Sequence, residues 1–266
     1  MSFEKRVKDN LSYYKEHILK NSKPGHIKHR YILPKEDGNL NYLLGIRDKI
    51  DGYLNQLEVP INLHRGFHHL NSSQAMCLNF FYPFIQENSY THLTQALKLN
   101  GEITSLIFEH VENEKEGTNF DVCLNLKNKQ KVFIEIKYTE AKFKSISNIS
   151  KGHLFKKQTF YMEPLLKGFN EDWLEHNFFK NYQLLRNLPY ANQNQLVYLI
   201  FSRQHTKMVN EVNNVLNIMN KEMRKYVEIV YWEDLVSNLL NAFTQDDIAS
   251  KYLHVHFKDF QEKYSL

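Results

Sequence analysis

Residues 119–138 constrain the fold of this chain more than any other segment. Two runs of alternating apolar and polar residues flank a turn rich in Lys, Asn and Gln. Alternation with a period of two is typical of half-buried strands, so the segment predicts a β-hairpin. Within each strand, the apolar residues expected to share a face are Phe120, Val122, Leu124 and Leu126 in the first run, and Val132, Ile134 and Ile136 in the second.

The same alternation sends Asp121, Glu135 and Lys137 to the opposite face. The numbers 121 and 135 sum to 256, so a turn centred on residue 128 would set the two carboxylates opposite each other. Like charges opposite each other on paired strands are destabilising, so the pair is expected to hold a divalent cation. The alternative is an exposed hairpin face with a Glu135–Lys137 surface pair. The spacing alone is weak evidence, since Glu140-Ala-Lys repeats the acid-x-Lys pattern.

This arrangement resembles the PD-(D/E)xK nuclease superfamily, the fold of many type II restriction endonucleases. Asp121 matches the first acid and Glu135-Ile136-Lys137 the ExK triplet, while Phe120 stands where the superfamily has proline. Further segments look like a bacterial group of restriction-endonuclease-like proteins, recognised mostly by fold. The resemblance covers residues 62–202, and its segments are residues 71–74, 116–121, 135–140 and 182–187.

The resemblance implies a Mg²⁺-dependent phosphodiesterase, with Mn²⁺ as a substitute, that acts as a DNA endonuclease. Asp121 and Glu135 would be metal ligands, with the backbone carbonyl of Ile136 as a third. Lys137 would orient or deprotonate the attacking water, which makes Asp121, Glu135 and Lys137 the expected catalytic residues. The alternative is a nucleic-acid-binding protein that keeps the fold with weak or no cleavage.

Other polar residues are candidates for completing the site. Gln183 and Arg186 share a helix face, and the resemblance suggests that Gln183 meets the site and Arg186 a phosphate. A surface pair that supports packing is an equal alternative. Gln74 is expected to meet either a cap partner or the substrate. The further acids that could join the site are Glu109, Glu116 and Glu140.

Basic residues follow the second predicted strand. The net charge of the chain is +4, and residues 141–157 contain five lysines and no acid. Lys151, Lys156 and Lys157 are therefore expected to contact phosphates of a nucleic acid. A solvated loop is the alternative.

The composition excludes several classes of protein. Gly is scarce, with 9 in 266 residues, and there is no glycine-rich nucleotide-binding loop. Cys77 and Cys123 lie in apolar runs and are expected to be buried free thiols. With neither a signal peptide nor a membrane span, the expected location is the cytoplasm. Whether the protein forms a homodimer is left open.

The order of predicted elements indicates an α/β protein: a restriction-endonuclease-like core, with a central mixed sheet flanked by helices, and an N-terminal helical extension. The extension is placed at residues 1–60 and the nuclease domain at 61–266. His254 and His256 would share a strand face, and neither has a partner spaced for zinc. Helices are predicted over residues 3–21, 40–57, 90–99, 172–188, 208–223 and 235–243, with another beginning at the caps 71–73 and ending near Pro83. Strands are predicted over 103–111, 196–201 and 227–232, besides the hairpin.

Overall fold

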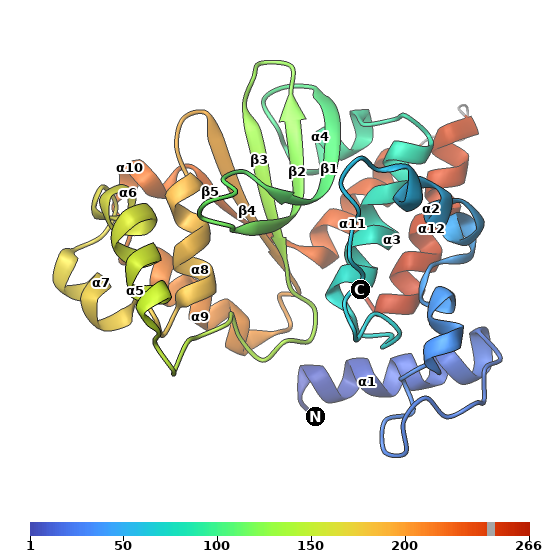
Figure 1. The fold of residues 1–266 in the computed structure, drawn as a ribbon. Coiled ribbons are helices and arrows are strands. Elements are labelled where there is room, and N and C mark those ends of the chain that lie inside the picture. The colour runs from blue at the N-terminus through green and yellow to red at the C-terminus, as the bar shows by residue number, and fades with distance from the viewer. Residues whose placement is uncertain (244–247) are drawn as a thin grey trace. The chain divides into compact units, whose positions relative to one another are not determined.

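The computed structural model describes residues 1–243 and 248–266, and its ribbon is drawn in Figure 1. The chain is α/β, with a five-stranded mixed sheet flanked by helices, which confirms the predicted fold class. It forms two compact units. Unit 1 comprises residues 1–103, 136–139 and 231–266, and unit 2 comprises 104–135 and 140–230. The first sixty residues are therefore part of unit 1, together with the segments that follow them.

The strands lie in the order β1-β2-β3-β4-β5, and most of their residues belong to unit 2. They are β1 (Ile103–Val111), β2 (Asn119–Leu126), β3 (Lys131–Ile136), β4 (Gln195–Phe201) and β5 (Val227–Tyr231). The helices of unit 2 are α5 (Lys151–Lys156), α6 (Met162–Leu166), α7 (Glu171–Asn177), α8 (Tyr182–Asn187), α9 (Thr206–Leu216) and α10 (Lys221–Arg224). A π-helical turn (Lys157–Tyr161) follows α5, and a 3-10 turn (Leu188–Tyr190) follows α8.

The hairpin has the predicted register. Strands β2 and β3 are antiparallel, and the pairs run from Asn125 opposite Lys131 to Val122 opposite Ile134. Each pair of numbers sums to 256, as a turn centred on residue 128 requires. Continuing this register by one residue sets position 121 opposite position 135.

The predicted faces fail at the start of β2. Phe120 was expected to share a face with Val122, but it stacks on Phe133 with ring centroids 4.6 Å apart and lies in one buried cluster with Cys123. The side chains therefore do not alternate regularly between residues 120 and 123, as happens at a β-bulge. The adjacent strand β1 is also irregular, because Glu109 has a φ of 51°. Two neighbouring strands thus depart from regular geometry beside Asp121.

Two predicted helices of unit 2 are broken in the structure. The helix expected over 172–188 is split into α7 and α8, because the N–H of Gln183 donates to the carbonyl of Lys144 (2.9 Å) instead of continuing one helix. The helix expected over 208–223 is split into α9 and α10, since Asn220 caps α10 by accepting from Met223 N–H. At the second of these breaks a polar cap interrupts a hydrophobic periodicity that remains helical throughout.

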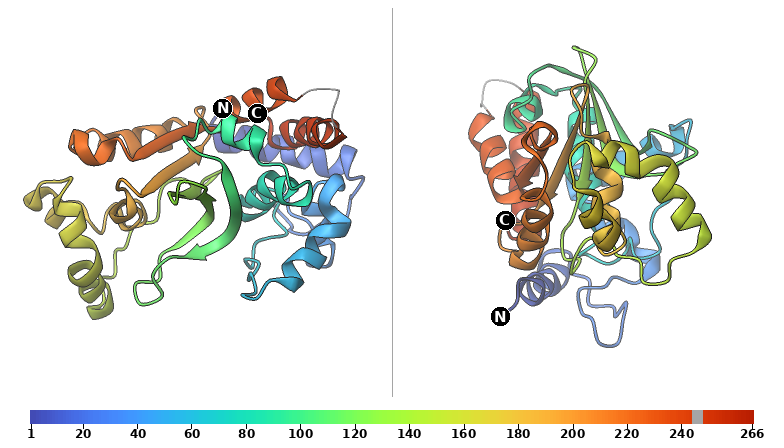
Figure 2. Two further views of the ribbon diagram at one scale, coloured as in Figure 1. Left: turned by 90° about the horizontal axis from the view of Figure 1, so that it is seen from above. Right: turned by 90° about the vertical axis from the view of Figure 1, so that its left-hand side faces the viewer.

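Unit 1 is helical. Its elements are α1 (Phe3–Tyr13) with a π-helical turn (Tyr14–Ile18), a 3-10 helix (Lys35–Asn41), α2 (Leu44–Gln56), α3 (Ser73–Gln86), α4 (Thr91–Ala96), α11 (Trp232–Ala242) and α12 (Ile248–Tyr264). Helix α3 is buried along most of its length and lies beside α12 (Figure 2). The ring of Phe80 meets those of Trp232, Phe257 and Phe260 at centroid distances of 5.0–5.4 Å, and these rings form the core of the unit.

Two predictions in unit 1 are wrong: that helix α3 ends near Pro83, and that His254 and His256 lie in a strand. Pro83 lies inside α3, which continues to Gln86, although proline has no N–H to donate to the carbonyl of Asn79. His256 supplies the missing partner, because its Nε2 lies 2.7 Å from that carbonyl oxygen. His256 and His254 are in helix α12, not in a strand. The prediction of buried free thiols is confirmed for both cysteines.

Candidate active site

Glu135 is a buried carboxylate on strand β3, with 3% of its surface exposed. Its Oε1 accepts a hydrogen bond from Gln183 Nε2 at 2.6 Å, and its Oε2 accepts one from Asn187 Nδ2 at 3.3 Å. Both donors are on α8. A buried carboxylate is costly without partners, and neutral amides orient it without cancelling its charge.

Helix α8 presents three polar side chains on neighbouring positions of its surface. Gln183 and Asn187 are four residues apart and so share a face. Arg186 lies beside them, with its guanidinium carbon 5.8 Å from the centroid of the Tyr182 ring. The Nε of Arg186 is buried and has no hydrogen-bond partner among the described residues. This Nε–H is therefore an unsatisfied donor inside the fold, while the residue as a whole is half-buried.

The other members of the predicted catalytic set differ in how the structure places them. Asp121 is half-buried on β2, one position beyond the last pair of the hairpin register described above. Because the alternation is broken at Phe120, the pleat alone does not fix the side of the sheet to which Asp121 points. Ile136 and Lys137 follow Glu135 in the chain and are buried within unit 1. The placement of Lys137 against the two carboxylates stays a prediction.

Glu116 is held by four donors and is 3% exposed. Its Oε1 accepts from the hydroxyls of Thr118 and Tyr161, and its Oε2 accepts from Thr118 N–H at 2.7 Å and from the Tyr190 hydroxyl at 2.8 Å. Burial, followed by the hydrogen bond to this carboxylate, raises the pKa of Tyr161. For Tyr190, burial and then the charge of Glu116 raise the pKa. Both phenols therefore stay protonated and donate.

The remaining polar candidates also have partners within the fold. Glu109 accepts from the amide of Asn119 at the start of β2. The main-chain carbonyl of Glu140 lies 2.8 Å from Nε2 of His205. Gln74 accepts from His64 N–H at 2.7 Å and donates to the Asn62 carbonyl at 3.2 Å. These bonds tie Gln74 to the loop that precedes α3, and its contact with a substrate stays a prediction.

The basic segment is divided by the structure, because two of its three named lysines, Lys156 and Lys157, donate to groups of the fold. Lys157 is 3% exposed, donates to Glu175 at 2.7 Å and lies 5.7 Å from the Phe178 ring centroid. Lys156 donates to the main-chain carbonyl of Glu116 at 2.6 Å. Lys151 is exposed. The sequence placed all three outside because lysine is rarely buried without a partner, and these partners come from distant segments.

The donor set of this region fits a hard divalent cation. Within residues 1–243 and 248–266, no three His, Cys, Asp or Glu side chains are grouped to hold a metal ion. The predicted ligands are two carboxylates and one main-chain carbonyl, so they do not amount to three such side chains. Mg²⁺ is commonly bound through one or two carboxylates and keeps several waters or substrate oxygens. Asp121 and the buried Glu135 suit that mode.

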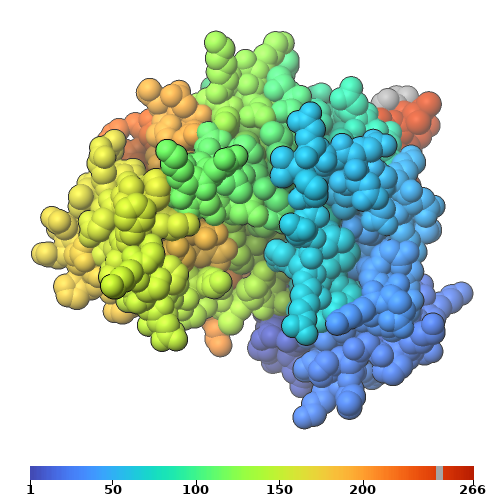
Figure 3. Space-filling model, viewed as in Figure 1, coloured from blue at the N-terminus to red at the C-terminus, as the bar shows by residue number. Residues whose placement is uncertain are grey.

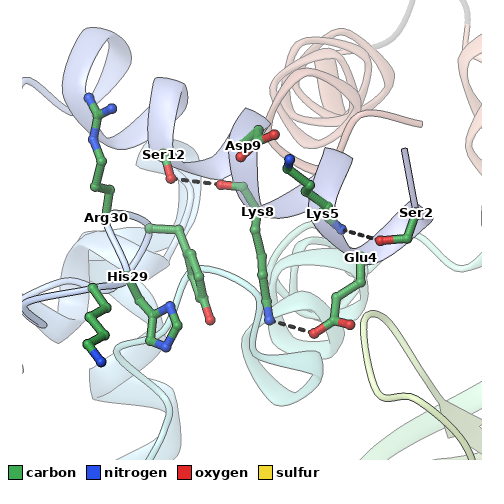
Figure 4. Close-up of a pocket in the computed structure, with 10 residues that line it drawn as sticks. Ser2, Glu4, Lys5, Lys8, Asp9, Ser12, His29 and Arg30 are labelled. Atoms are coloured by element: carbon green, nitrogen blue, oxygen red, sulfur yellow. Dashed lines mark hydrogen bonds and ion pairs between the residues drawn. The ribbon is translucent and has the colours of Figure 1, made fainter.

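A separate cavity in unit 1, of about 370 Å³, contains none of the predicted site residues. Figure 4 shows its lining from α1 and the segment around Arg30. Two of its four Lys and Arg side chains are paired, since Lys8 binds Glu4 at 2.5 Å and Arg30 binds Glu16 at 2.5 Å. We assign it no chemistry. None of the helices in the described parts of the chain is long and apolar enough to cross a membrane.

Asn187, Tyr161 and Tyr190 are among the residues that hold the acids and were not predicted from sequence. Asn187 could have been found, because it is four residues from Gln183 in the segment 182–187 that carried the resemblance. The two tyrosines are among 16 in the chain, and no spacing links them to Glu116. Only the tertiary fold identifies them.

The chain was compared with known proteins. A model of the family described as Restriction Endonuclease associating with ARP matches residues 6–265, nearly the whole chain. No curated protein matches, and no solved structure does.

Proposed function

Since the chain belongs to the family of restriction endonucleases associating with ARP, which implies a nuclease-like role on nucleic acid, we propose that it is a metal-dependent DNA endonuclease. The observation that carries the proposal is the setting of Glu135. This acid is buried in β3, held at both oxygens by α8, and followed two positions later by Lys137 in an ExK triplet. Such a setting fixes the carboxylate in one orientation, as a metal ligand needs.

The residues divide the work of phosphodiester hydrolysis as follows. Asp121, Glu135 and the carbonyl of Ile136 would hold the Mg²⁺, and Gln183 and Asn187 fix the plane of the Glu135 carboxylate. When bound, the ion supplies Lewis acidity toward the phosphate and lowers the pKa of a water. Lys137 would orient the attacking water or, in its neutral form, take a proton from it.

Arg186 supports the same proposal from α8. Its guanidinium is half-buried on the helix that holds Glu135, and a guanidinium binds phosphate oxygens through paired N–H donors. The positive φ of Glu109 adds a second kind of support, because backbone held in sparsely populated regions is frequent beside functional sites.

Calorimetric titration of Mn²⁺ tests the site. Wild type should give binding heat and Asp121→Asn should give none, since the neutral amide cannot balance the cation. Asp172→Asn, which changes an exposed acid of α7 in the same unit, is the matched control and should bind like wild type. Equal heat from wild type and Asp121→Asn would remove Asp121 from the site.

Cleavage of supercoiled plasmid with Mg²⁺ or Mn²⁺ tests the activity. We expect nicked or linear product from wild type and none from Asp121→Asn. A protein that binds DNA in these assays but never cleaves it, on varied DNA and RNA, would instead be the nucleic-acid-binding protein of the same fold.

A further inference from the structure

The segment from α5 into the following π-helical turn has its polarity inverted. The side facing the protein carries lysines, with Lys156 on the Glu116 carbonyl and the buried Lys157 on Glu175. The side facing outward carries Leu154 and Phe155, which are 49% and 65% exposed. Apolar side chains gain free energy when removed from water, so this arrangement leaves that gain unused in the isolated chain.

The outward residues form one stripe. Lys151, Leu154, Phe155 and Gln158 stand at positions i, i+3, i+4 and i+7, and all four are exposed. We call these four residues the α5 stripe. Ser150 fixes where α5 begins, because its hydroxyl caps His153 N–H at 3.2 Å while His153 Nδ1 accepts from Ser150 N–H. In Figure 3 this part of the chain, coloured yellow-green, lies at the surface turned toward the viewer.

The segment that carries the stripe is basic, and the acids that bind it, Glu175 on Lys157 and Glu211 on the N–H of Phe143, come from other elements. Lys142, Lys144 and Lys151 are exposed, and residues 141–162 contain no acid. An apolar partner surface alone would have no need of these cations. A polyanion that also carries flat apolar rings meets both features, because its phosphates pair with lysines and its bases stack on an aromatic side chain.

The segment is also tied to the candidate active site. Gln183 accepts from Lys144 N–H at 3.1 Å and donates its own N–H to the Lys144 carbonyl, while its side-chain amide holds Glu135. The basic segment and the proposed metal ligand therefore share one residue as their anchor. A strand held by these lysines would be held by the same part of unit 2 that positions the acid.

We propose that the α5 stripe binds a single strand of nucleic acid, with Phe155 stacking on an unpaired base and Lys142, Lys144 and Lys151 contacting its phosphates. This inference rests on the proposed function and adds the strand and the residues that hold it. Stacking needs an accessible base face, so binding favours single-stranded or unpaired regions over intact duplex.

Fluorescence anisotropy of a labelled oligothymidylate, with the intact chain in EDTA, tests the proposal without cleavage. Phe155→Ala should weaken binding about tenfold, because stacking on an aromatic ring contributes on that order per base. Phe155→Trp should retain the affinity. Lys151→Ala should reduce the slope of log affinity against log salt by about 0.7. Ile218→Ala, which shortens a 44% exposed apolar residue of the same unit, is the matched control and should change neither quantity.

Two results would overturn the inference. One is that Phe155→Ala and Lys151→Ala both bind the oligonucleotide as tightly as wild type does. The absence of any binding by wild type would overturn the inference equally. The other is a Phe155→Ala protein that loses a dimer by light scattering while its affinity for the oligonucleotide is unchanged. Plasmid cleavage separates the two proposals. If wild type cleaves plasmid but Phe155→Ala binds the oligonucleotide as wild type does, only this inference is removed. If binding depends on Phe155 but wild type does not cleave, only the nuclease activity is removed.

Discussion

The cluster around Glu116 gives the sharpest prediction about stability. Tyr161→Phe keeps the buried ring and removes only the hydroxyl that donates to Glu116 Oε1. A hydrogen bond to a charged group contributes about 1.5–3 kcal/mol, and no cavity forms because the ring remains. We therefore expect the free energy of unfolding to fall by that amount, a large share of what holds a domain folded.

Urea denaturation followed by both fluorescence and circular dichroism measures the change. Tyr182→Phe is the matched control: its ring centroid is 6.5 Å from that of Tyr161, and its hydroxyl is not among the four donors to Glu116. A double-mutant cycle with Glu116→Gln should give a coupling of about 1–2 kcal/mol between Tyr161 and Glu116. Unfolding energies for Tyr161→Phe and Tyr182→Phe that agree within about 0.5 kcal/mol would refute the reasoning.

The same variants decide whether Glu116 belongs to the metal site. All four donors of its hydrogen bonds lie within the fold and saturate both carboxylate oxygens. The structure thus gives Glu116 the role of joining the segment before β2 to Tyr161 and Tyr190. Mn²⁺ binding heat per folded molecule should then be unchanged in Tyr161→Phe and in Glu116→Gln. Loss of that heat in Glu116→Gln alone would make Glu116 a ligand.

Two more predictions concern catalysis and pH. Lys137→Ala should leave Mn²⁺ and DNA bound while plasmid nicking falls by about 10²–10⁴-fold, the usual loss for a positioned proton-transfer group; equal nicking by both proteins would exclude the proposed role. Burial lowers the pKa of His256 to about 4, so the unfolded chain binds the extra proton between pH 4 and the unfolded pKa near 6.5. The contribution of a neutral His256 to the free energy of unfolding should therefore be complete above about pH 6.5 and fall by about 3 kcal/mol as the pH drops to 4. This part of the pH dependence should be absent in His256→Gln.

Local pattern was enough to predict the hairpin, because its information lies in consecutive residues. Alternation and turn composition fixed both strands and the register between them, down to the pairing of Val122 with Ile134. The rule of alternating faces failed two residues further along β2, at Phe120. There the ring of Tyr190, more than sixty residues away in sequence, packs against Phe120 at a centroid distance of 5.2 Å and forms part of the cluster on the other face. A period of two cannot show where a distant side chain overrides it.

The buried lysines show why the site could be predicted only in part. Sequence rules place lysine outside and phenylalanine inside, and around α5 both rules fail together. Lys157 can be buried because Glu175 and two aromatic rings receive its ammonium group, and its long methylene chain is itself apolar. None of these partners is at a helical spacing from Lys157. Phe155 stays exposed, although the core of the chain takes up many other aromatic rings. An exposed phenylalanine beside a buried lysine is therefore specific to this segment. That is the physical reason to look for a partner at Phe155 and the exposed Lys151, and not at Lys156 and Lys157, which have partners within the fold.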